Sequence, residues 1–531
     1  MIPVAGMAGL NLSTATKVIV ACAGVGSRMQ EVHQELHKGL LPYVDAPLLW
    51  HIISRIPSDV QTLVLTGHKS QQIQNLLSIC FPERQLNFIE VLDYLSADSG
   101  TAKSLMTAEP FVEDSFWYIP CDATFGEELE KFIRDEPNGN TIFVSDLSSV
   151  DHPEDFTTVE SSLGSVNKIQ FKGRHQHLEN AKIFTGLMFV KEGKKFLYKL
   201  KHSQSKEFVP LLDSTFGVTE VFSWKDFGTP VEYFKNKNLD SNYDFSKPHE
   251  ITYVLPEVIV KYFEDRTELQ KKQIKPKDLP KVYPSKVGVS DPFFYYEKIE
   301  GQTLYGNVSE DKFRNLLNWL KVELWIPTTD KVAESVSEFY VEKTIKRIDL
   351  IKRMVPYNFD SIYLINDEKR LCPSEVIKDI CWEAVVKSVA PGKIHGDLQF
   401  DNIVAQEDGS FRLIDWRTSF GQCFLGGDIH YDLAKLLGGI RMNYSEVKKG
   451  NFFFRNHELK IFFNFPSCEN KMSLERVLAE FCIDNGYDWA KIERLVAIIY
   501  LNMSPLHSRP FADLLFFHSL NQLFESSGII K

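Results

Sequence analysis

Apolar runs separated by polar turns characterise the amino-terminal half of the chain. Residues 17–22 (KVIVAC) form a continuous apolar run rich in β-branched side chains, which is typical of a buried parallel strand. A second run, residues 62–67 (TLVLTG), ends in a turn, and a third, residues 117–122 (WYIPCD), ends on an aspartate. This pattern predicts the strands of an α/β domain.

The carboxyl-terminal half begins with strand-like runs and ends with helical periodicity. Residues 251–263 (ITYVLPEVIVKYF) contain two apolar runs split by Pro256, which predicts a hairpin. Residues 292–301 (PFFYYEKIEG) predict an aromatic strand. Farther along, apolar residues recur at three- and four-residue spacing, which predicts helices over residues 432–437, 474–485 and 489–503.

A polar, turn-rich stretch separates the two halves. Residues 236–249 (NKNLDSNYDFSKPH) have the composition of a linker. A length of 531 residues also favours two or three domains. We therefore expect a flexible leader over residues 1–16, a first domain over residues 17–236, a linker over residues 237–249 and a second domain over residues 250–531.

Composition and charge favour small-molecule chemistry. The net charge of −11 and the pI near 5.8 argue against a dedicated nucleic-acid or anionic-membrane binder. Eight scattered cysteines without a C-x-x-C pair suggest reduced thiols rather than a disulfide framework or a zinc site. The first sixteen residues lack the features of a signal peptide, and no apolar run is long enough to span a bilayer. These features predict a cytoplasmic protein.

The segment KIHGDLQFDNIVAQEDGSFRLIDWR, residues 393–417, gives the clearest indication of chemistry. It predicts a loop, a strand from Asn402, a turn, and a second strand that ends on Asp415. Phosphoryl transfer from ATP needs a carboxylate for the attacking hydroxyl and oxygen ligands for Mg²⁺. Asp397 would be the base, and Asn402 and Asp415 the metal ligands. Ordinary turn residues are the alternative, but the full spacing disfavours it.

This segment resembles the aminoglycoside phosphotransferase and choline kinase family, which writes H-G-D-x-x-x-x-N, then I-D-[WF] and G-D-x-x-x-D-L-A. The last motif matches residues 427–434. The resemblance implies an α+β two-lobed, protein-kinase-like domain with a small lobe at about residues 250–305 and a large lobe at about residues 306–531. It also implies that Lys261 binds ATP phosphates, with Glu268 as its carboxylate partner, and that a hinge holding adenine contains Tyr296, Glu297 and Lys298.

Two features of the small lobe are ambiguous. A lysine at a strand end is often only a solvated surface residue, and an aromatic strand is often only core. The family's nucleotide-covering loop usually contains glycine, but no glycine occurs between Asp244 and Lys261. This departure puts the cover over the phosphates in doubt.

A glycine-bearing loop follows the first predicted strand. Residues 23–29 read AGVGSRM, and KGLLP follows at residues 38–42. Such a loop lets backbone N–H groups approach a triphosphate, whose charge Arg28 and Lys38 would neutralise. The alternative is a tight strand-to-helix turn without a ligand, because glycine pairs after strands are common.

Together with GTA at residues 100–102, CD at residues 121–122 and DFGTP at residues 226–230, this loop resembles the nucleotidyltransferases that make nucleotide sugars and CDP-alcohols. The resemblance implies a Rossmann-like α/β fold and Mg²⁺ held by Asp122 and Asp226. It implies that Lys38 and Arg28 act in catalysis and that the nucleotide is bound by Gly24, Gly26, Ser27, Arg28, Gly100 and Thr101. The departures from the family pattern are Cys22, His37 and Cys121.

The two resemblances describe consecutive reactions. A kinase makes a phosphate monoester, and a nucleotidyltransferase consumes one, so we expect a bifunctional transferase that uses ATP, a second NTP (CTP or UTP) and Mg²⁺. The acceptor would be a small polar alcohol, an amino alcohol such as choline, or a sugar, and the product an NDP-activated donor for surface glycan or lipid decoration. Arg417 after IDW would repel an ammonium group. A sensing protein with one inactive domain is the alternative of a different class.

Overall fold

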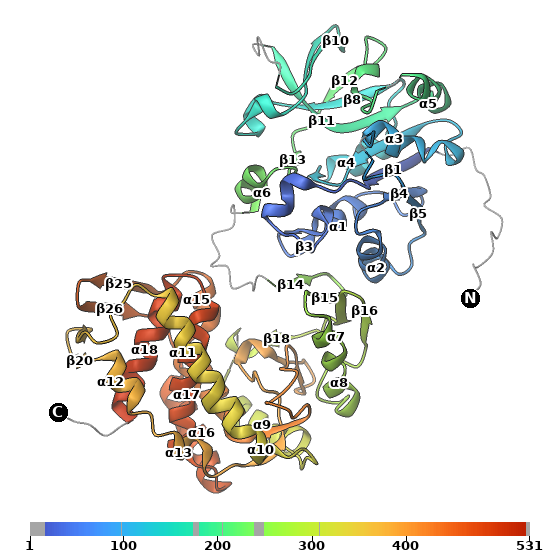
Figure 1. The fold of residues 1–531 in the computed structure, drawn as a ribbon. Helices are drawn as coiled ribbons and strands as arrows, with labels where there is room; N and C mark the ends of the chain where they lie inside the picture. The colour runs from blue at the N-terminus through green and yellow to red at the C-terminus, as the bar shows by residue number, and fades with distance from the viewer. Residues whose placement is uncertain are drawn as a thin grey trace. The chain divides into compact units, whose positions relative to one another are not determined.

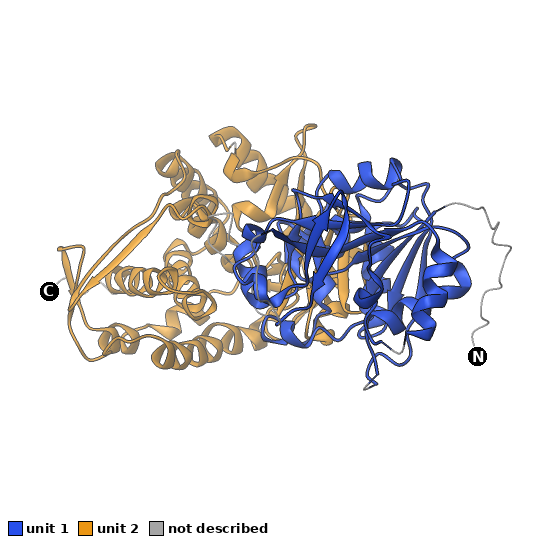
Figure 2. Ribbon diagram, turned by 90° about the horizontal axis from the view of Figure 1, so that it is seen from above, with its two compact units in different colours: residues 1–240, 253–255 blue, residues 241–252, 256–531 orange. Residues whose placement is uncertain are grey.

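The computed structural model describes residues 16–96, 98–173, 180–203, 205–237, 249–306 and 308–526. The predicted leader, apart from residue 16, and nearly all of the predicted linker lie outside these ranges. The chain divides into two compact units (Figures 1 and 2). Unit 1 comprises residues 1–240 and 253–255, and unit 2 comprises residues 241–252 and 256–531.

Unit 1 is built on a nine-stranded mixed sheet with the order β5-β4-β1-β6-β11-β8-β12-β10-β9. Strand β1 (Lys17–Cys22) pairs in parallel with β4 (Thr62–Thr66) and β6 (Phe116–Pro120), and β4 pairs in parallel with β5 (Leu86–Glu90). In chain order these four strands lie 3-2-1-4, which is the order of a Rossmann half. The predicted strands over residues 17–22 and 62–67 are confirmed, and unit 1 has a Rossmann-like α/β fold.

The remaining strands of this sheet extend it on the side of β6. They are β8 (Thr141–Ser145), β9 (Thr158–Ser162), β10 (Ser165–Gln170), β11 (Ala181–Val190) and β12 (Gly217–Glu220). Helices cover the strands with their apolar faces, as α2 does with Ile73, Leu76 and Leu77. These helices are α1 (Leu48–Ile53), α2 (Ser70–Cys80), α3 (Thr101–Met106), α4 (Glu128–Arg134), α5 (Gly193–His202) and α6 (Pro230–Lys237).

The carboxyl-terminal half begins with a four-stranded sheet of order β14-β15-β17-β16, which belongs to unit 2 apart from residues 253 and 254 of β14. Its strands are β14 (Glu250–Val254), β15 (Val258–Phe263), β16 (Val287–Ser290) and β17 (Phe293–Glu297). Residues 255–257 form the turn between β14 and β15, which are neighbours in the sheet as the hairpin prediction requires. Helices α7 (Arg266–Lys272) and α8 (Ile274–Asp278) follow β15.

The remainder of unit 2 is mainly helical, and the predicted helices are present. The periodicity over residues 489–503 corresponds to α17 (Trp489–Met503), and that over residues 474–485 to α16 (Lys471–Asp484). Residues 432–437 are the middle of a longer helix, α14 (Ile429–Arg441). The other helices include α9 (Glu310–Trp319), α10 (Val332–Ser337), α11 (Lys343–Met354), α12 (Pro373–Lys378), α13 (Trp382–Val386), α15 (Tyr444–Lys448) and α18 (Phe511–Ser526).

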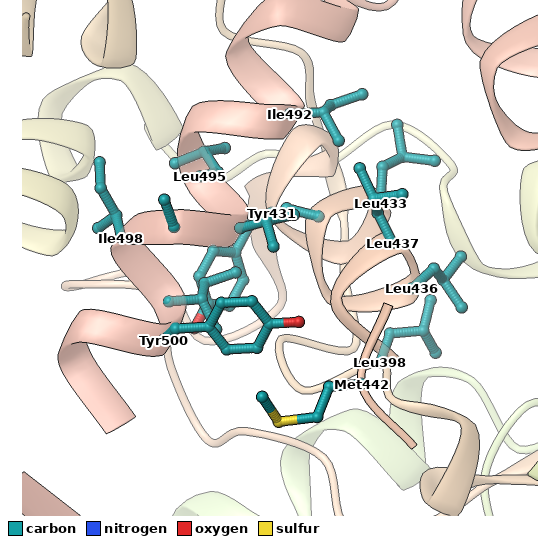
Figure 3. Close-up of a cluster of buried hydrophobic side chains, with 14 of the residues drawn as sticks. Leu398, Tyr431, Leu433, Leu436, Leu437, Met442, Ile492, Leu495, Ile498 and Tyr500 are labelled. Carbon is teal, nitrogen blue, oxygen red and sulfur yellow. The ribbon is translucent and has the colours of Figure 1, made fainter. Parts of the chain in front are cut away.

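Helices α14 and α17 pack together in the core of unit 2 (Figure 3). Leu433, Leu437 and Leu495 are fully buried there, and each such side chain contributes about 1.5–3 kcal/mol to stability. Leu398, which directly follows Asp397 in the chain, is buried in the same cluster. The hydrophobic core therefore anchors the loop that contains Asp397.

The hairpin predicted after that loop is present with slightly different bounds. Strands β22 (Ile403–Ala405) and β23 (Phe411–Leu413) are antiparallel, and β18 (Gln302–Thr303) extends their sheet. Asn402 was expected to begin the first strand, but it ends a 3-10 turn, Phe400–Asn402. The turn forms because the side-chain amide of Asn402 donates to the Asp397 carbonyl, at 2.8 Å.

Membrane-spanning helices are absent from the described part of the chain, where no helix combines the necessary length and hydrophobicity. The cytoplasmic location stays a prediction.

Candidate active sites

The loop after β1 brings Gly26 against Lys38. Gly26 has φ +65° and precedes the 3-10 turn Ser27–Glu31, and a Cβ at this position would lie 2.9 Å from the Cδ atom of Lys38. Glycine is therefore needed both for the backbone conformation and for the close approach of the lysine stem. A Cβ at Gly24 would meet nothing within 4 Å, so no packing contact requires glycine there. Ser27 and Arg28 are exposed beside it.

Lys38 pairs with Asp122. Strand β6 ends at Pro120, and Cys121 and then Asp122 follow it. The Nζ atom of Lys38 lies 2.6 Å from Oδ2 of Asp122. Burial by itself would lower the pKa of Lys38, but the Asp122 carboxylate outweighs burial and raises it. The same pairing holds the pKa of Asp122 below its usual value although burial acts in the opposite direction. Both side chains are therefore charged at neutral pH.

Asp226 brings a second carboxylate to Asp122. Strand β13 (Lys225–Asp226) pairs with β7 (Ala123–Thr124), and the Phe227 N–H donates to the Asp122 carbonyl at 2.8 Å. A Cβ built on Gly228 would lie 3.3 Å from Oδ2 of Asp122 and 3.4 Å from both carboxylate oxygens of Asp226. The two carboxylates therefore flank one small space. Burial, and then the charge of Asp122, raise the pKa of Asp226 to about 7.

This pair of carboxylates fits a divalent cation. Two negative groups that face one space, one of them with a raised pKa, are stabilised by a shared positive charge. Within the described ranges no group of three or more His, Cys, Asp or Glu side chains could hold a metal. Mg²⁺ commonly takes only one or two protein carboxylates and completes its shell with water and phosphate oxygens, so Asp122 and Asp226 would suffice.

Gly100 and Thr101 begin helix α3 and have partners of their own in unit 1. A Cβ on Gly100 would lie 2.2 Å from the carbonyl oxygen of Lys206, so only glycine fits at this position. The hydroxyl of Thr101 donates to the Glu207 carboxylate. Packing against residues 206–207 therefore explains both residues, and their predicted role in nucleotide binding stays a prediction.

His37, a departure from the family pattern, has a structural role next to Lys38. Its ring is 1% exposed, and Nδ1 accepts the Gly39 N–H at 3.1 Å, which caps the 3-10 turn Lys38–Leu40. Burial, with Lys38 as the next cause, lowers the pKa of His37 to about 3. The neutral ring thus fixes the backbone from which Lys38 reaches Asp122.

This low pKa predicts a loss of stability in acid. The unfolded chain has a His pKa of about 6.5, so between about pH 3 and 6.5 the unfolded state binds more protons, and stability falls as pH falls through that window. The His37 contribution to the free energy of unfolding should fall by about 2 kcal/mol from pH 7 to pH 5. In His37→Asn the side chain still caps the turn but does not titrate. Urea unfolding of the full chain at both pH values should therefore show a smaller difference for this variant.

The matched control for this prediction is His202→Asn, which changes an exposed histidine of α5 in the same unit. Its pH dependence should follow the wild type. An equal loss of stability in wild type and in His37→Asn would contradict the assigned role of the buried ring.

In unit 2, buried Asp432 of helix α14 holds the loop that contains Asp397. Its carboxylate accepts the N–H groups of His395 and Gly396, both at 2.8 Å, and the indole N–H of Trp325 at 3.1 Å. The ring of His395 also fixes this loop, because Nδ1 accepts the Asp397 N–H at 3.2 Å and Nε2 lies 2.9 Å from the Ile414 carbonyl. These bonds explain why the H-G-D and D-L-A motifs occur together.

Asp397 pairs with Lys435 on the same helix α14. The Nζ atom of Lys435 lies 2.7 Å from Oδ1 of Asp397, and Lys435 is 6% exposed. Burial would raise the pKa of Asp397, but Lys435, followed by Arg417, lowers it well below its usual value. The sequence motifs did not indicate Lys435. Its position three residues after Asp432 places it on the same side of the helix, which is the signal that was available.

Lys261 pairs with Asp415. Its Nζ atom lies 2.5 Å from Oδ1 of Asp415 and 3.6 Å from Oε1 of Glu250, and the Tyr296 hydroxyl donates to the same Asp415 oxygen at 3.3 Å. The Lys261 charge lowers the pKa of Asp415 although burial acts to raise it. Asp415 also has φ +59°, an unusual conformation for a residue other than glycine.

Three other predicted residues of unit 2, Glu268, Glu297 and Lys298, have partners of their own. The prediction that Glu268 pairs with Lys261 was wrong, because Glu268 accepts the Thr418 hydroxyl at 2.6 Å and pairs with Lys271 at 2.9 Å. Glu250 on β14 is the additional carboxylate instead. Glu297 is bonded to Ser285 near the end of β17, and the Lys298 N–H donates to the Glu257 carbonyl. Their role in holding adenine stays a prediction.

Asn402 and Asp415 lie side by side at the end of the hairpin. The Ile414 N–H donates to the Asn402 carbonyl at 2.9 Å. Because Asp415 directly follows Ile414 in the chain, this bond brings Asp415 close to Asn402. The side-chain nitrogen of Asn402 donates to the Asp397 carbonyl, and the side-chain oxygen takes no part in that bond. An amide oxygen and a carboxylate are suitable donors for Mg²⁺. The three residues of the predicted kinase motif are thus gathered at one place.

No family model matches the chain. It is 28% identical over 154 residues to the bifunctional protein GlmU of Methanococcus maripaludis strain C5, a match that covers 28% of this chain and 33% of the relative. The protein of the same name from Methanocaldococcus jannaschii is 26% identical over 142 residues, which is 27% of this chain and 32% of the relative. The chain thus spans about a third of the length of the curated relatives it matches.

The comparison with solved structures finds, among others, the inositol-1-phosphate CTP transferase from T. maritima. Its sequence is 16% identical to this chain and the TM-score is 0.34. The match covers 41% of this chain and 92% of the chain in that structure. The similarity to the curated relatives supports the nucleotidyltransferase prediction for the amino-terminal half. Each of these matches covers less than half of the chain, and the kinase prediction for unit 2 stays a prediction.

Proposed function

We propose that the chain is a bifunctional transferase. Unit 2 phosphorylates a small hydroxyl compound with ATP, and unit 1 transfers a nucleotidyl group, from CTP or UTP, to a phosphate monoester. The observation that supports this most directly is the gathering of Asp397, Asn402 and Asp415, with Lys261 on the last of them. Unit 1 has its own set in Lys38, Asp122 and Asp226.

In unit 2, the ion pairs support the following roles in phosphoryl transfer. Asp397 is held as a carboxylate by Lys435 and would accept the proton of the attacking hydroxyl. The hydroxyl oxygen bonds to the γ-phosphorus, the bond from that phosphorus to the β–γ bridging oxygen breaks, and ADP leaves. Lys261 would bind the phosphates, and Asn402 and Asp415 would hold Mg²⁺, which neutralises phosphate charge when bound.

In unit 1, the nucleophile is a phosphate monoester, which is already ionised. The protein therefore has to supply positive charge and position rather than a base. Lys38 and the exposed Arg28 would neutralise the triphosphate as pyrophosphate leaves, and the Gly24–Gly26 loop would let the backbone approach it. Asp122 and Asp226 would hold Mg²⁺, which polarises the α-phosphate when bound.

Mass spectrometry of reaction products tests this proposal. The full chain with Mg²⁺ and ATP, incubated with a panel of amino alcohols, polyols and sugars, should add one phosphoryl group to an acceptor. Addition of CTP or UTP should then convert that phosphate to an NDP derivative with release of pyrophosphate. Nucleotidyl transfer to a supplied phosphate without any ATP-dependent phosphorylation would support the sensing alternative for unit 2 and overturn the bifunctional proposal.

A further inference from the structure

Lys435, Arg417 and Lys343 lie near the Asp397 carboxylate in unit 2, and Arg347 lies near Lys343 and Arg417. Lys435 forms an ion pair with this carboxylate. The guanidinium Nε of Arg417 donates at 3.2 Å to the carbonyl of Gly396, the residue before Asp397. Lys343 and Arg347 are one turn apart on helix α11 and so face the same side. Among the described residues, no carboxylate lies within ion-pair distance of Lys343, Arg347 or Arg417.

Two of these cations lie over one aromatic ring. The Nζ atom of Lys343 is 3.6 Å and the guanidinium carbon of Arg417 is 5.4 Å from the centre of the Phe339 ring. Phe339 itself stacks on Phe420, with ring centres 4.0 Å apart, and Tyr431 packs edge-on at 5.0 Å. The aromatic cluster therefore fixes the Phe339 ring, and the ring holds both cations close to each other.

The excess of positive charge in this cluster is unfavourable. Burial, followed by the charges of Arg417, Lys435 and Arg347, lowers the pKa of Lys343 well below its usual value. Burial and Arg417 likewise lower the pKa of Arg347. The nearby Asp397 carboxylate acts in the opposite direction on Lys343, but it already pairs with Lys435. A cluster in which cations outnumber carboxylates attracts an anion.

We propose that the acceptor of unit 2 carries an anionic group, a phosphate or a carboxylate, which Lys343 and Arg417 bind over the Phe339 ring. This inference rests on the proposed kinase function. The anion lies on the Arg417 side of Asp397, and the acceptor hydroxyl meets the Asp397 carboxylate itself. The proton passes from that hydroxyl to Asp397, the new O–P bond replaces the bond to the bridging oxygen, and ADP leaves. A quaternary ammonium acceptor is excluded by like-charge repulsion.

A matched acceptor panel gives the first test. ADP release is measured with glucose, glucose 6-phosphate, glucuronate and choline, so that one carbon skeleton is presented neutral, phosphorylated and carboxylated. We expect kcat/KM for an anionic member to exceed that for glucose at least tenfold, and the better of the two anions identifies the group. Lys343→Gln and Arg417→Gln should raise KM for that acceptor at least tenfold with little change in kcat. Transfer to glucose or choline but to neither anion would overturn the proposal.

A binding experiment tests the site separately from the kinase reaction. Inorganic phosphate is titrated into the full chain without ATP, for wild type and for the double variant Lys343→Gln/Arg417→Gln. We expect one site to be lost in the double variant and kept in Lys346→Gln, which removes an exposed cation from the same helix. Equal binding by wild type and the double variant would overturn the anion site. Loss of the site in that variant, with no acceptor phosphorylated by wild type, would support the site and contradict only the kinase function.

Discussion

Replacement of Asp397 by asparagine is expected to reduce ATP-dependent phosphorylation by about 10²- to 10⁴-fold, the usual contribution of a general base. Asparagine keeps a hydrogen-bond acceptor for buried Lys435, which lies 2.7 Å from the carboxylate, but it cannot take the hydroxyl proton. ADP release with a phosphorylatable acceptor measures the effect. Nucleotidyl transfer from an NTP to a supplied phosphate should be unchanged, because unit 1 has its own residues.

The control for this prediction is Asp401→Asn, which removes a carboxylate from the same loop. Asp401 pairs with Lys448 at 2.7 Å rather than with Lys435, so its loss should change phosphorylation less than threefold. Similar thermal unfolding of both variants would show that the loop remains folded. A full rate of phosphorylation in Asp397→Asn would remove the base from the proposed mechanism.

Replacement of Lys38 by methionine is expected to reduce nucleotidyl transfer by about 10²- to 10³-fold, the usual effect of removing one group that stabilises developing charge. Methionine keeps the apolar stem that packs on Gly26 but removes the cation 2.6 Å from Asp122. Pyrophosphate release with CTP or UTP and a phosphate monoester measures the reaction. Phosphorylation by unit 2 should be unaffected.

Lys168→Met is the matched control for unit 1. Lys168 pairs with Glu160 at 3.3 Å between two strands at the edge of the sheet, and more than half of its side chain is exposed. Its loss should leave pyrophosphate release within about twofold of wild type. Should Lys38→Met retain the wild-type rate while Lys168→Met also does, Lys38 would be a structural partner of Asp122 and not part of the reaction.

Local pattern was enough to predict much of the secondary structure. The run over residues 17–22 is apolar after Lys17 because β1 lies between two parallel neighbours. The periodic spacing over residues 489–503 predicted α17, in which every residue from Leu495 to Leu501 is buried. The motif around Asp397 was equally local, since its residues lie within one loop and one hairpin. Lys435 lies only three residues after Asp432 of the D-L-A motif, whereas nothing local ties Lys343 to these motifs, because only packing brings α11 to this site.

His37 shows why a departure from a family pattern is difficult to interpret from sequence. In the sequence, His37 is one of three departures from the nucleotidyltransferase pattern, and it directly precedes Lys38. In the structure the buried ring accepts the Gly39 N–H and so caps the turn that carries Lys38. The prediction for Glu268 was wrong for a different reason. Its helix position suited a partner for Lys261, but in the structure Glu268 bonds to Thr418 and Lys271 instead.

The turn between β14 and β15 has a consequence for how much ATP unit 2 hydrolyses without phosphorylating an acceptor. Residues 255–257 connect the two strands directly, with no glycine, so this hairpin has no long flexible segment to fold over a bound triphosphate. Water would then compete with the acceptor for the terminal phosphoryl group. We expect unit 2 to hydrolyse some ATP to ADP and phosphate when its acceptor is scarce. The ratio of phosphorylated product to ATP consumed should then rise with acceptor concentration.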